Sequence, residues 1–255
     1  MHNLPSLGVE STAAAPVDRR VVELRQYTLH PGRRDLLVNL FEREFIEPQE
    51  QVGAHVLGHF YDAEDDNRFV WLRSFADMGS RRKALESFYY GPVWGQHRDA
   101  ANSTMVDSDD VLLLRPSEPV PPVLDDGSVR PSNADSPSDA IFALTVYQLP
   151  SPEVAEFAAH FAASMGPVLR GAGVDLVATM GSAQERNTFV ALPIREEVHC
   201  FVTLARHEST EAYADFTRAW DASGTKRAML DDLSRRSVDV LQEATLRPAR
   251  RSLLR

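Results

Sequence analysis

Residues 22–29 read VELRQYTL, and residues 142–149, which lie 120 positions later, read FALTVYQL. The leucines and the tyrosine of the two stretches coincide without a gap. Phe41 and Phe161 follow at the same offset, and FVWL at 69–72 is matched by FVTL at 201–204. Similarity that keeps its order along the chain indicates a tandem repeat of one structural module.

Each half follows the order β-α-β-β-α-β. Alternating and 3.6-residue apolar patterns predict the first-half strands at 21–29, 54–61, 68–75 and 111–114, with helices at 33–51, from Asp77, and near 93–106. The second-half strands are predicted at 141–149, 174–180, 199–206 and 238–246, with helices at 152–169 and at 210–235, the latter broken near 223–224. This split βαβ order is typical of ferredoxin-like folds.

A ferredoxin-like module covers only one face of its sheet with helices, so the other face needs a partner. A second copy in the same chain is the simplest partner. We therefore predict an α+β fold in which two βαββαβ modules face each other through antiparallel sheets, as a pseudo-dimeric α/β barrel of about eight strands.

Two segments are too polar or too rich in proline to fold by themselves. We predict a disordered tail over 1–18, a first module over 19–115, a Pro/Ser/Asp-rich linker over 116–139, and a second, divergent module over 140–255.

Composition narrows the function classes. A formal net charge of -10 without a basic run argues against nucleic-acid binding. The single cysteine, Cys200, cannot form an intramolecular disulfide, and its apolar neighbours indicate a buried thiol rather than a nucleophile. No apolar run approaches the roughly 20 residues of a membrane span, and the N-terminus lacks a secretory signal. These features, with a strong preference for Arg over Lys, predict a cytoplasmic, bacterial protein.

The first half resembles the NIPSNAP family. Residues 23–29, ELRQYTL, with Pro31-Gly32, are similar to the opening of that family, E-L-R-x-Y-x-L-x-P-G. LGHF at 57–60, the turn at 66–68 and WLRSF at 71–75 resemble its middle strands, and Arg81-Arg82 and Trp94 resemble its closing elements. The likeness covers about residues 20–115. The second half keeps only fragments, with Ala143 and Thr145 at the positions of the strand glutamate and arginine.

The resemblance implies the dimeric α/β-barrel superfamily, which includes cofactor-independent quinone-forming monooxygenases, small isomerases and haem-binding relatives of chlorite dismutase. The first hypothesis is therefore an enzyme that needs no cofactor and acts on an aromatic or polyketide-like compound in the barrel lumen, as a monooxygenase, isomerase or cyclase. The alternatives are a non-catalytic ligand carrier or protein-interaction module, and a haem-binding barrel. Further homo-oligomerisation beyond the pseudo-dimer is open.

Strand alternation sorts the first-half residues into two faces. One face is apolar, with Val22 and Leu24 on the first strand, Val56, Gly58 and Phe60 on the second, and Val70 and Leu72 on the third. The other mixes polar and aromatic residues: Glu23, Arg25, Tyr27, His55, Leu57, His59, Tyr61, Phe69, Trp71, Arg73 and Phe75. We expect the apolar face to lie under the helices and the mixed face to line the lumen.

Roles follow from side-chain chemistry. The predicted catalytic residues are His59 as a general base, Arg25 and Arg73 as cations that hold an oxyanion, and Tyr27 as a hydrogen-bond donor. The predicted substrate-binding residues are Glu23, His55, Tyr61, Trp71 and Phe75.

Each of these residues also has a structural interpretation. Glu23 and Arg25 could form an ion pair, joined by Arg73, and the two histidines could be ordinary hydrogen-bonded side chains. Trp71 and Trp94 are typical of core or interface anchors. His97 is a candidate haem ligand by analogy alone, and the acidic residues 62–66 are typical of a solvated hairpin tip rather than a calcium loop.

Overall fold

The computed structural model of the chain describes residues 21–117, 130, 138–150 and 152–255. The predicted N-terminal tail and most of the predicted linker lie outside these residues. The elements of the N-terminal half are β1 (Val21–Leu29), α1 (Arg34–Leu40), the π-helical turn η1 (Phe41–Phe45), α2 (Ile46–Gln51), β2 (His55–Asp62), β3 (Arg68–Phe75), α3 (Met78–Tyr89), α4 (Pro92–Asn102) and β4 (Met105–Pro116).

The C-terminal half repeats this order. Its elements are β5 (Ile141–Gln148), α5 (Val154–His160), the π-helical turn η3 (Phe161–Met165), α6 (Gly166–Gly171), β6 (Asp175–Ser182), β7 (Cys200–His207), α7 (Thr210–Asp221), α8 (Gly224–Arg235) and β8 (Asp239–Pro248). The equivalent elements from β1 to β2 and from β5 to β6 differ by 120 positions, π-helical turn included, which confirms the repeat seen in the sequence.

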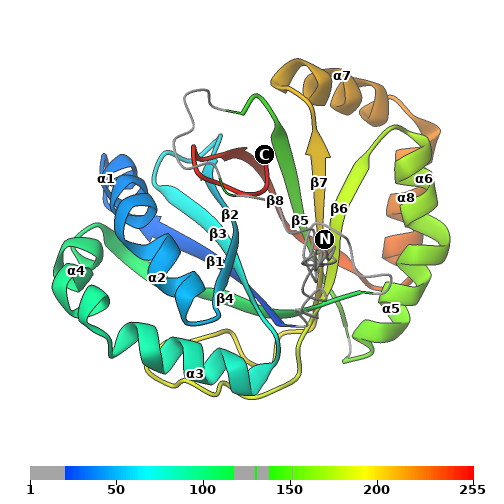
Figure 1. Cartoon of the computed structure of the whole chain (residues 1–255). Coiled ribbons are helices and arrows are strands. Elements are labelled where there is room, and N and C mark those ends of the chain that lie inside the picture. The colour runs from blue at the N-terminus through cyan, green and yellow to red at the C-terminus, as the bar shows by residue number, and fades with distance from the viewer. Residues whose placement is uncertain (1–20, 118–129, 131–137, 151) are drawn as a thin grey trace, which may run out of the picture.

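The eight strands close into one antiparallel barrel in the order β1-β3-β2-β8-β5-β7-β6-β4. Each half supplies four neighbouring strands. The halves join where β2 pairs with β8, as in Tyr61 opposite Arg247, and where β4 pairs with β6, as in Leu114 opposite Ser182. Helices α1–α4 cover one side and α5–α8 cover the other (Figure 1). The predicted pseudo-dimeric barrel is confirmed.

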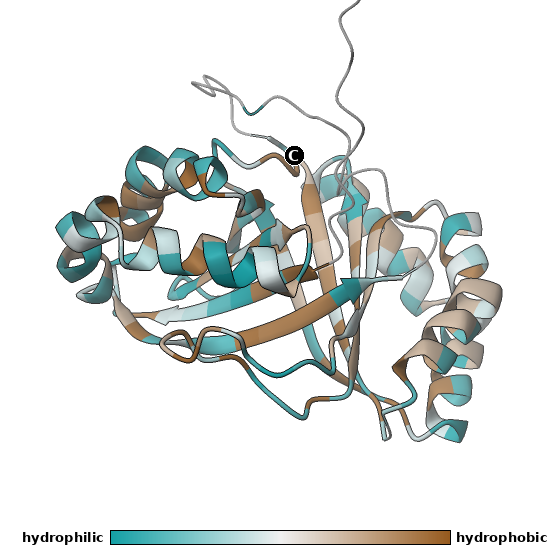
Figure 2. Cartoon of the chain, turned by 60° about the horizontal axis from the view of Figure 1, so that its bottom comes forward, coloured by the Kyte–Doolittle hydropathy of each residue, from teal (hydrophilic) through white to brown (hydrophobic). Residues whose placement is uncertain are grey.

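Apolar side chains from both halves fill the barrel interior. Val22, Leu24 and Leu72 of the first half meet Phe142, Leu144 and their neighbours of the second in one cluster whose members are at most 4% exposed. Figure 2 shows the brown, apolar stretches on the strands between the two helical layers. Cys200 belongs to this cluster, as expected for a buried thiol, and burial raises the pKa of its thiol to about 11.

The predicted assignment of the two faces was wrong. The apolar face points into the barrel, and the mixed face of Glu23, Arg25, Tyr27, Trp71 and Arg73 lies beneath the helices. The physical reason is hydrogen bonding: the barrel interior offers buried charges few partners, whereas the helical layer supplies polar side chains that satisfy them.

Strand β2 departs further from simple alternation. A bulge between Val56 and Gly58 shifts its register against β3. Leu57, expected on the same face as the histidines, therefore packs inside the barrel, while Val56 packs under the helices. A bulge adds one residue to a strand and reverses the alternation beyond it.

Most boundaries shift by one or two residues, and the largest differences lie at α4 and β4. Helix α4 ends at Asn102 rather than near 106, and β4 begins at Met105 rather than at 111. Thr104 ends the helix by donating its hydroxyl to the Ala101 carbonyl at 2.6 Å, which frees Met105 to pair with Leu29. The predicted turn at Pro31-Gly32 is confirmed, and Gly32 has the positive φ of 74° that such a turn demands.

The connection between β6 and β7 is much longer than its counterpart between β2 and β3. Residues 183–199 cross to the N-terminal half, where Phe189 stacks on Tyr89 at 5.9 Å and the Arg195 backbone donates to the Val111 carbonyl at 2.8 Å. In Figure 1 this segment runs along the bottom of the molecule beside α3. The two halves are thus linked outside the barrel as well as through it.

Candidate functional site

A buried ionic cluster lies beneath the helices of the N-terminal half. The Glu23 carboxylate accepts hydrogen bonds from Arg25 at 2.9 Å, from Arg73 at 2.8 Å and from Arg81 at 2.6 Å. All four side chains are fully buried. The sequence prediction of a Glu23–Arg25 ion pair, with Arg73 as a third member, is confirmed.

The cluster holds Glu23 ionised. Burial by itself would raise the pKa of this carboxyl, but the guanidinium groups of Arg73, Arg25 and Arg81 outweigh it and hold the pKa far below its usual range. With three permanent cations and one carboxylate, the cluster carries two excess positive charges.

Neutral groups from the helices complete the cluster. Gln49 of α2 accepts from Arg73 at 2.7 Å, and Tyr89 of α3 accepts from the same guanidinium at 3.4 Å. Asn187 and Thr188, from the long β6–β7 connection, each accept from Arg81 at 3.1 Å. Sequence reasoning missed these partners because they lie on other elements.

Three predicted residues surround the cluster. Tyr27 accepts a hydrogen bond from Arg25 at 2.9 Å. Trp71 lies under the guanidinium groups of Arg25 and Arg73, at 5.5 and 5.0 Å from its ring centre. Phe75 is also within 5.5 Å of Arg73. These aromatic contacts stabilise buried cations, so Trp71 is a core anchor here.

His59 does not join this cluster. It is fully buried against Phe41, and its Nε2 lies 2.8 Å from the Glu42 carboxylate. Burial lowers the pKa of His59, although Glu42 opposes this effect. The same carboxylate accepts from the Arg251 backbone at 2.8 Å, so the histidine positions the segment that follows β8.

The remaining candidates lie nearer the surface. His55 lies 3.3 Å from Glu50, and Tyr61 lies under Arg34 at 5.1 Å. His97 lies 3.5 Å from Glu44 and packs on Phe45. The acidic tip is a hairpin turn in which Asp62 accepts from two following backbone amides. The nine predicted site residues therefore do not form a single site.

The C-terminal half carries different residues at the positions of the ionic cluster. Ala143, Thr145 and Ala205 replace Glu23, Arg25 and Arg73 on the equivalent strands. Short side chains leave the space under the helices unfilled, and a pocket of about 610 Å³ opens there. The prediction that the second module has lost the polar residues is correct, and the loss leaves room for this cavity.

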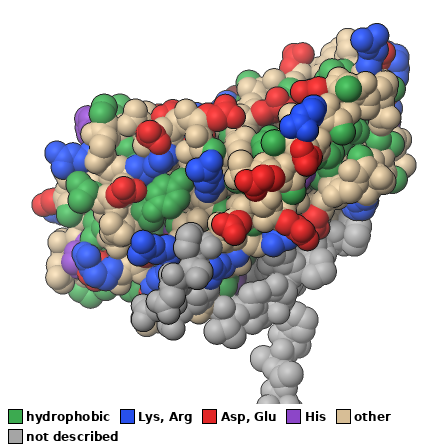
Figure 3. Space-filling model, turned by 90° about the horizontal axis from the view of Figure 1, so that it is seen from above, with side chains coloured by type: hydrophobic (Ala, Val, Ile, Leu, Met, Phe, Trp, Pro, Cys, Tyr) green, Lys and Arg blue, Asp and Glu red, His purple; other side chains and the backbone are tan. Residues whose placement is uncertain are grey.

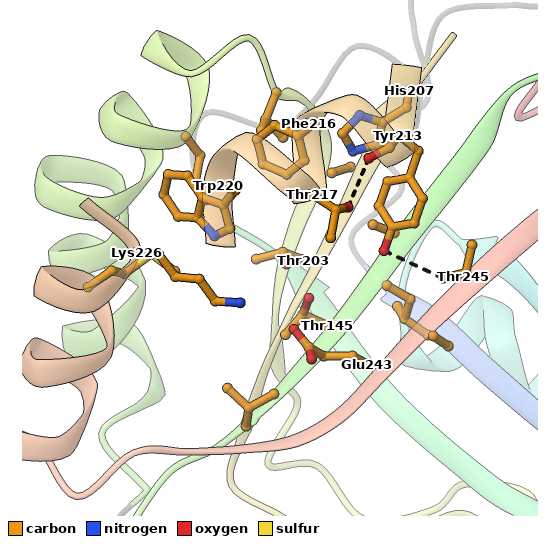
Figure 4. A pocket seen from close by; sticks show the side chains of 18 of the residues that line it. Thr145, Thr203, His207, Tyr213, Phe216, Thr217, Trp220, Lys226, Glu243 and Thr245 are labelled. Atoms are coloured by element: carbon orange, nitrogen blue, oxygen red, sulfur yellow. Dashed lines mark hydrogen bonds between the residues drawn. The ribbon is translucent and has the colours of Figure 1, made fainter. Parts of the chain in front are cut away.

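Helices α7 and α8 form the outer wall of this pocket. Helix α3 buries four residues against its sheet, whereas α7 buries none and α8 buries only Leu233. Figure 4 shows Phe216, Thr217 and Trp220 of α7 on one side of the pocket and Thr145, Thr203 and Glu243 of the strands on the other.

Polar groups converge on this pocket among its aliphatic and aromatic side chains. His207 packs against Tyr213 and Phe216 at 5.0 and 5.1 Å, and its Nε2 has no hydrogen-bond partner among the described residues. Burial lowers the pKa of His207, with Asp175 opposing, so its ring is neutral near pH 7. Lys226 is paired with Asp221 at 2.5 Å. The pocket thus offers a neutral imidazole, threonine hydroxyls and the Glu243 carboxylate to a ligand.

The sequence model of the NIPSNAP family matches residues 22–120. These residues form a NIPSNAP domain. The match ends before the second half, so the ionic cluster lies largely in the NIPSNAP domain and the open pocket lies outside it.

Solved structures match both halves together. The chain is similar to an anthrone oxidase-like protein, with a TM-score of 0.56, 10% identity, and coverage of 91% of this chain and 92% of the other. It is also similar to candidate monooxygenases from Fusobacterium nucleatum (TM-score 0.55, 8% identity, 90% and 92% covered) and Lactobacillus acidophilus (TM-score 0.52, 9% identity, 91% and 93% covered). At such identities the likeness shows the fold alone. A comparison with curated proteins finds no match.

The described residues contain no group of three or more His, Cys, Asp and Glu side chains placed to hold a metal ion. Within the same residues, no helix combines the length and the apolar character that a bilayer span requires. The face in Figure 3 carries acidic side chains interspersed with basic ones, rather than the continuous basic surface that binds phosphates.

Proposed function

We propose that the chain binds a small, largely apolar aromatic molecule in the pocket between the C-terminal sheet and helices α7 and α8. The observation that carries the proposal is the contrast between the halves: side chains fill this space in the NIPSNAP domain, and a cavity of about 610 Å³ occupies it in the C-terminal half. Pockets of this size, in which polar groups converge among aliphatic and aromatic side chains, are typical small-molecule sites.

The net negative charge of the residues that line the pocket favours a ligand that donates hydrogen bonds. The charged residues that line the pocket are Glu64, Asp221, Glu243 and Lys226. Because the single lysine is already paired with Asp221, the pocket has an excess of negative charge. It suits a hydroxyl or amine group on the ligand and disfavours a carboxylic acid.

A second candidate function is oxidation of the bound aromatic compound without a cofactor. It is favoured by the neutral imidazole of His207 and the carboxylate of Glu243, which could each take a proton from a ligand hydroxyl or an activated methylene. In such an oxidation, O2 and a methylene between aromatic rings give a ketone and water. A non-catalytic carrier would use the same pocket.

Fluorescence titration with 2-naphthol tests the binding proposal. Trp220 lines the pocket, so binding should change its emission, and Ala205→Phe, which fills the pocket, should abolish the change. Glu243→Gln should weaken binding roughly tenfold, as expected for a hydrogen bond to a charged group. Glu208→Gln, an exposed glutamate outside the pocket, is the matched control. Unchanged binding in Ala205→Phe would refute the proposal.

Oxygen consumption separates the enzyme from the carrier. With anthrone as the probe, an oxidase consumes O2 in proportion to the product formed, and His207→Gln or Glu243→Gln lowers the rate. A carrier binds the probe without O2 uptake above the protein-free rate.

We also expect a cytoplasmic location, since the single thiol is buried and reduced; cell fractionation checks this.

A further inference from the structure

A second, separate cavity lies on the outer surface of the NIPSNAP domain. It has a volume of about 440 Å³ and lies between the end of α3, helix α4, the start of β4 and the long β6–β7 connection. We call it the aromatic groove, after the five rings that line it, those of Tyr27, Tyr89, Tyr90, Trp94 and Phe189. It shares no lining residue with the C-terminal pocket.

The rings of the groove are arranged to hold a flat apolar group. Phe189 is parallel to Tyr89 at 5.9 Å and tilted against Tyr90 at 5.5 Å, while Trp94 meets Tyr89 edge-on at 4.9 Å. Tyr90 is 74% exposed, and Val190, which follows Phe189 in the chain, is 84% exposed. Such exposure of large apolar side chains beside a cavity is characteristic of a binding surface.

Two tyrosines connect the groove to the ionic cluster. Arg25 donates to the Tyr27 hydroxyl oxygen at 2.9 Å, and Arg73 donates to the Tyr89 hydroxyl oxygen at 3.4 Å. Because each oxygen already accepts from a guanidinium, its own proton is left to donate. The groove therefore presents two hydroxyl donors that are polarised by buried cations.

The net charge of the ionic cluster beneath Tyr27 and Tyr89 decides whether the groove favours a cation or an anion. Aromatic cages commonly bind cations, but the cluster beneath this one carries three guanidinium groups against the single carboxylate of Glu23. The Nη2 atoms of Arg25 and Arg81 have no hydrogen-bond partner among the described residues. Uncompensated positive charge in a buried site attracts an anion and repels a cation.

We propose that the aromatic groove binds an aromatic carboxylate. The ring lies among Tyr90, Trp94 and Phe189, and the carboxylate accepts hydrogen bonds from the hydroxyls of Tyr27 and Tyr89. The preference is opposite to that of the C-terminal pocket, which disfavours acids. The inference does not rest on the proposed function, because its residues lie on other elements.

Binding of 2-naphthoate to the full chain, measured by calorimetry, tests this proposal. Tyr90→Ala changes an exposed residue, so it should fold and should weaken binding roughly tenfold. Phe189→Ala truncates a buried ring and should weaken binding to a similar extent, with folding checked by circular dichroism. Tyr89→Phe removes one donor and should weaken it to a similar extent. Leu36→Ala, which truncates an exposed residue of α1 outside the groove, is the control and should bind as the unmodified chain does. Ala205→Phe, which fills the C-terminal pocket, should also leave naphthoate binding unchanged.

Three results would overturn the proposal. Equal binding of 2-naphthol and 2-naphthoate would show that the groove does not distinguish a negatively charged ligand from a neutral one. Tighter binding of phenyltrimethylammonium would identify a cation cage instead. Displacement by millimolar inorganic phosphate, with naphthoate binding unaffected by Tyr90→Ala and Phe189→Ala, would identify a simple anion site without an aromatic subsite.

Discussion

A few strand positions decide what lies under each helical layer. Glu23, Arg25 and Arg73 fill the N-terminal layer with a hydrogen-bonded ionic cluster, while Ala143 and Ala205, at equivalent positions, leave the C-terminal layer open. The same fold thus supports a closed core on one side and a pocket on the other.

The first prediction concerns Glu23. Glu23→Gln removes the only carboxylate that joins three buried guanidinium groups, so three like charges remain close together. Loss of one partner from a buried ion pair costs about 3–5 kcal/mol in unfolding free energy, and we expect a loss of this size on urea denaturation. Glu86→Gln, which removes an exposed partner of Arg82, should change stability little. A near-neutral Glu23→Gln would contradict this account of the cluster.

The second prediction concerns pH. The pKa of Glu23 is lowered on folding from its usual value of 4.5. A depressed carboxyl pKa contributes stability that is fully present above the unfolded pKa and is lost as pH falls toward the folded pKa. The stability difference between the unmodified chain and Glu23→Gln should therefore be constant near neutral pH and shrink below about pH 4.5. Denaturation curves at a series of pH values measure this stability difference. A difference that does not change with pH would contradict the lowered pKa of Glu23.

At the scale of elements, the pattern predicted which residues share a face but not which face is inside. Period-two alternation carries the first kind of information only. Which face points into the barrel depends on partners on the helices, such as Gln49, Tyr89 and Arg81. The pattern of a strand does not show where these helices lie. For the same reason the bulge in β2 and the contacts of the long β6–β7 connection were missed. The helix start at Asp77 was predicted correctly, because Asp77 caps α3 through a local hydrogen bond from the Ser80 amide.

The third prediction compares two equivalent helices. Helix α7 buries no residue, and α3 buries Arg81, Ala84, Leu85 and Phe88. Segments with few buried contacts open locally at low free-energy cost. We expect amide hydrogen exchange in α7 to be at least tenfold faster than in α3, and 2-naphthol to slow it. Equal protection of the two helices would mean that α7 is not a loosely held wall.

At the scale of the whole molecule, one apolar interior belongs to both halves. Leu144 is 1% exposed within the cluster that Leu24 and Leu72 share. The repeat in the sequence was enough to predict this closed barrel, because two copies of a half-covered sheet need each other. The location of the cavity was not predictable, since it follows from the lack of packing beneath α7 and α8.

The fourth prediction follows from this shared interior. Leu144→Ala should cost about 2–5 kcal/mol and should destabilise both halves together in one transition. Hydrogen exchange under increasing denaturant, followed separately in β1 and β5, provides the measurement. Two transitions, with β1 unaffected by the substitution, would show instead that the halves fold independently.

The proposed ligand site lies outside the barrel, under α7 and α8. A crystal structure of the chain soaked with 2-naphthol tests it most directly. We predict the naphthol ring between Phe216 and Trp220 on one side and Thr145 and Thr203 on the other, with its hydroxyl directed to Glu243 or His207. Density for the ring among Leu24, Leu72 and Phe142 in the barrel interior would contradict this location.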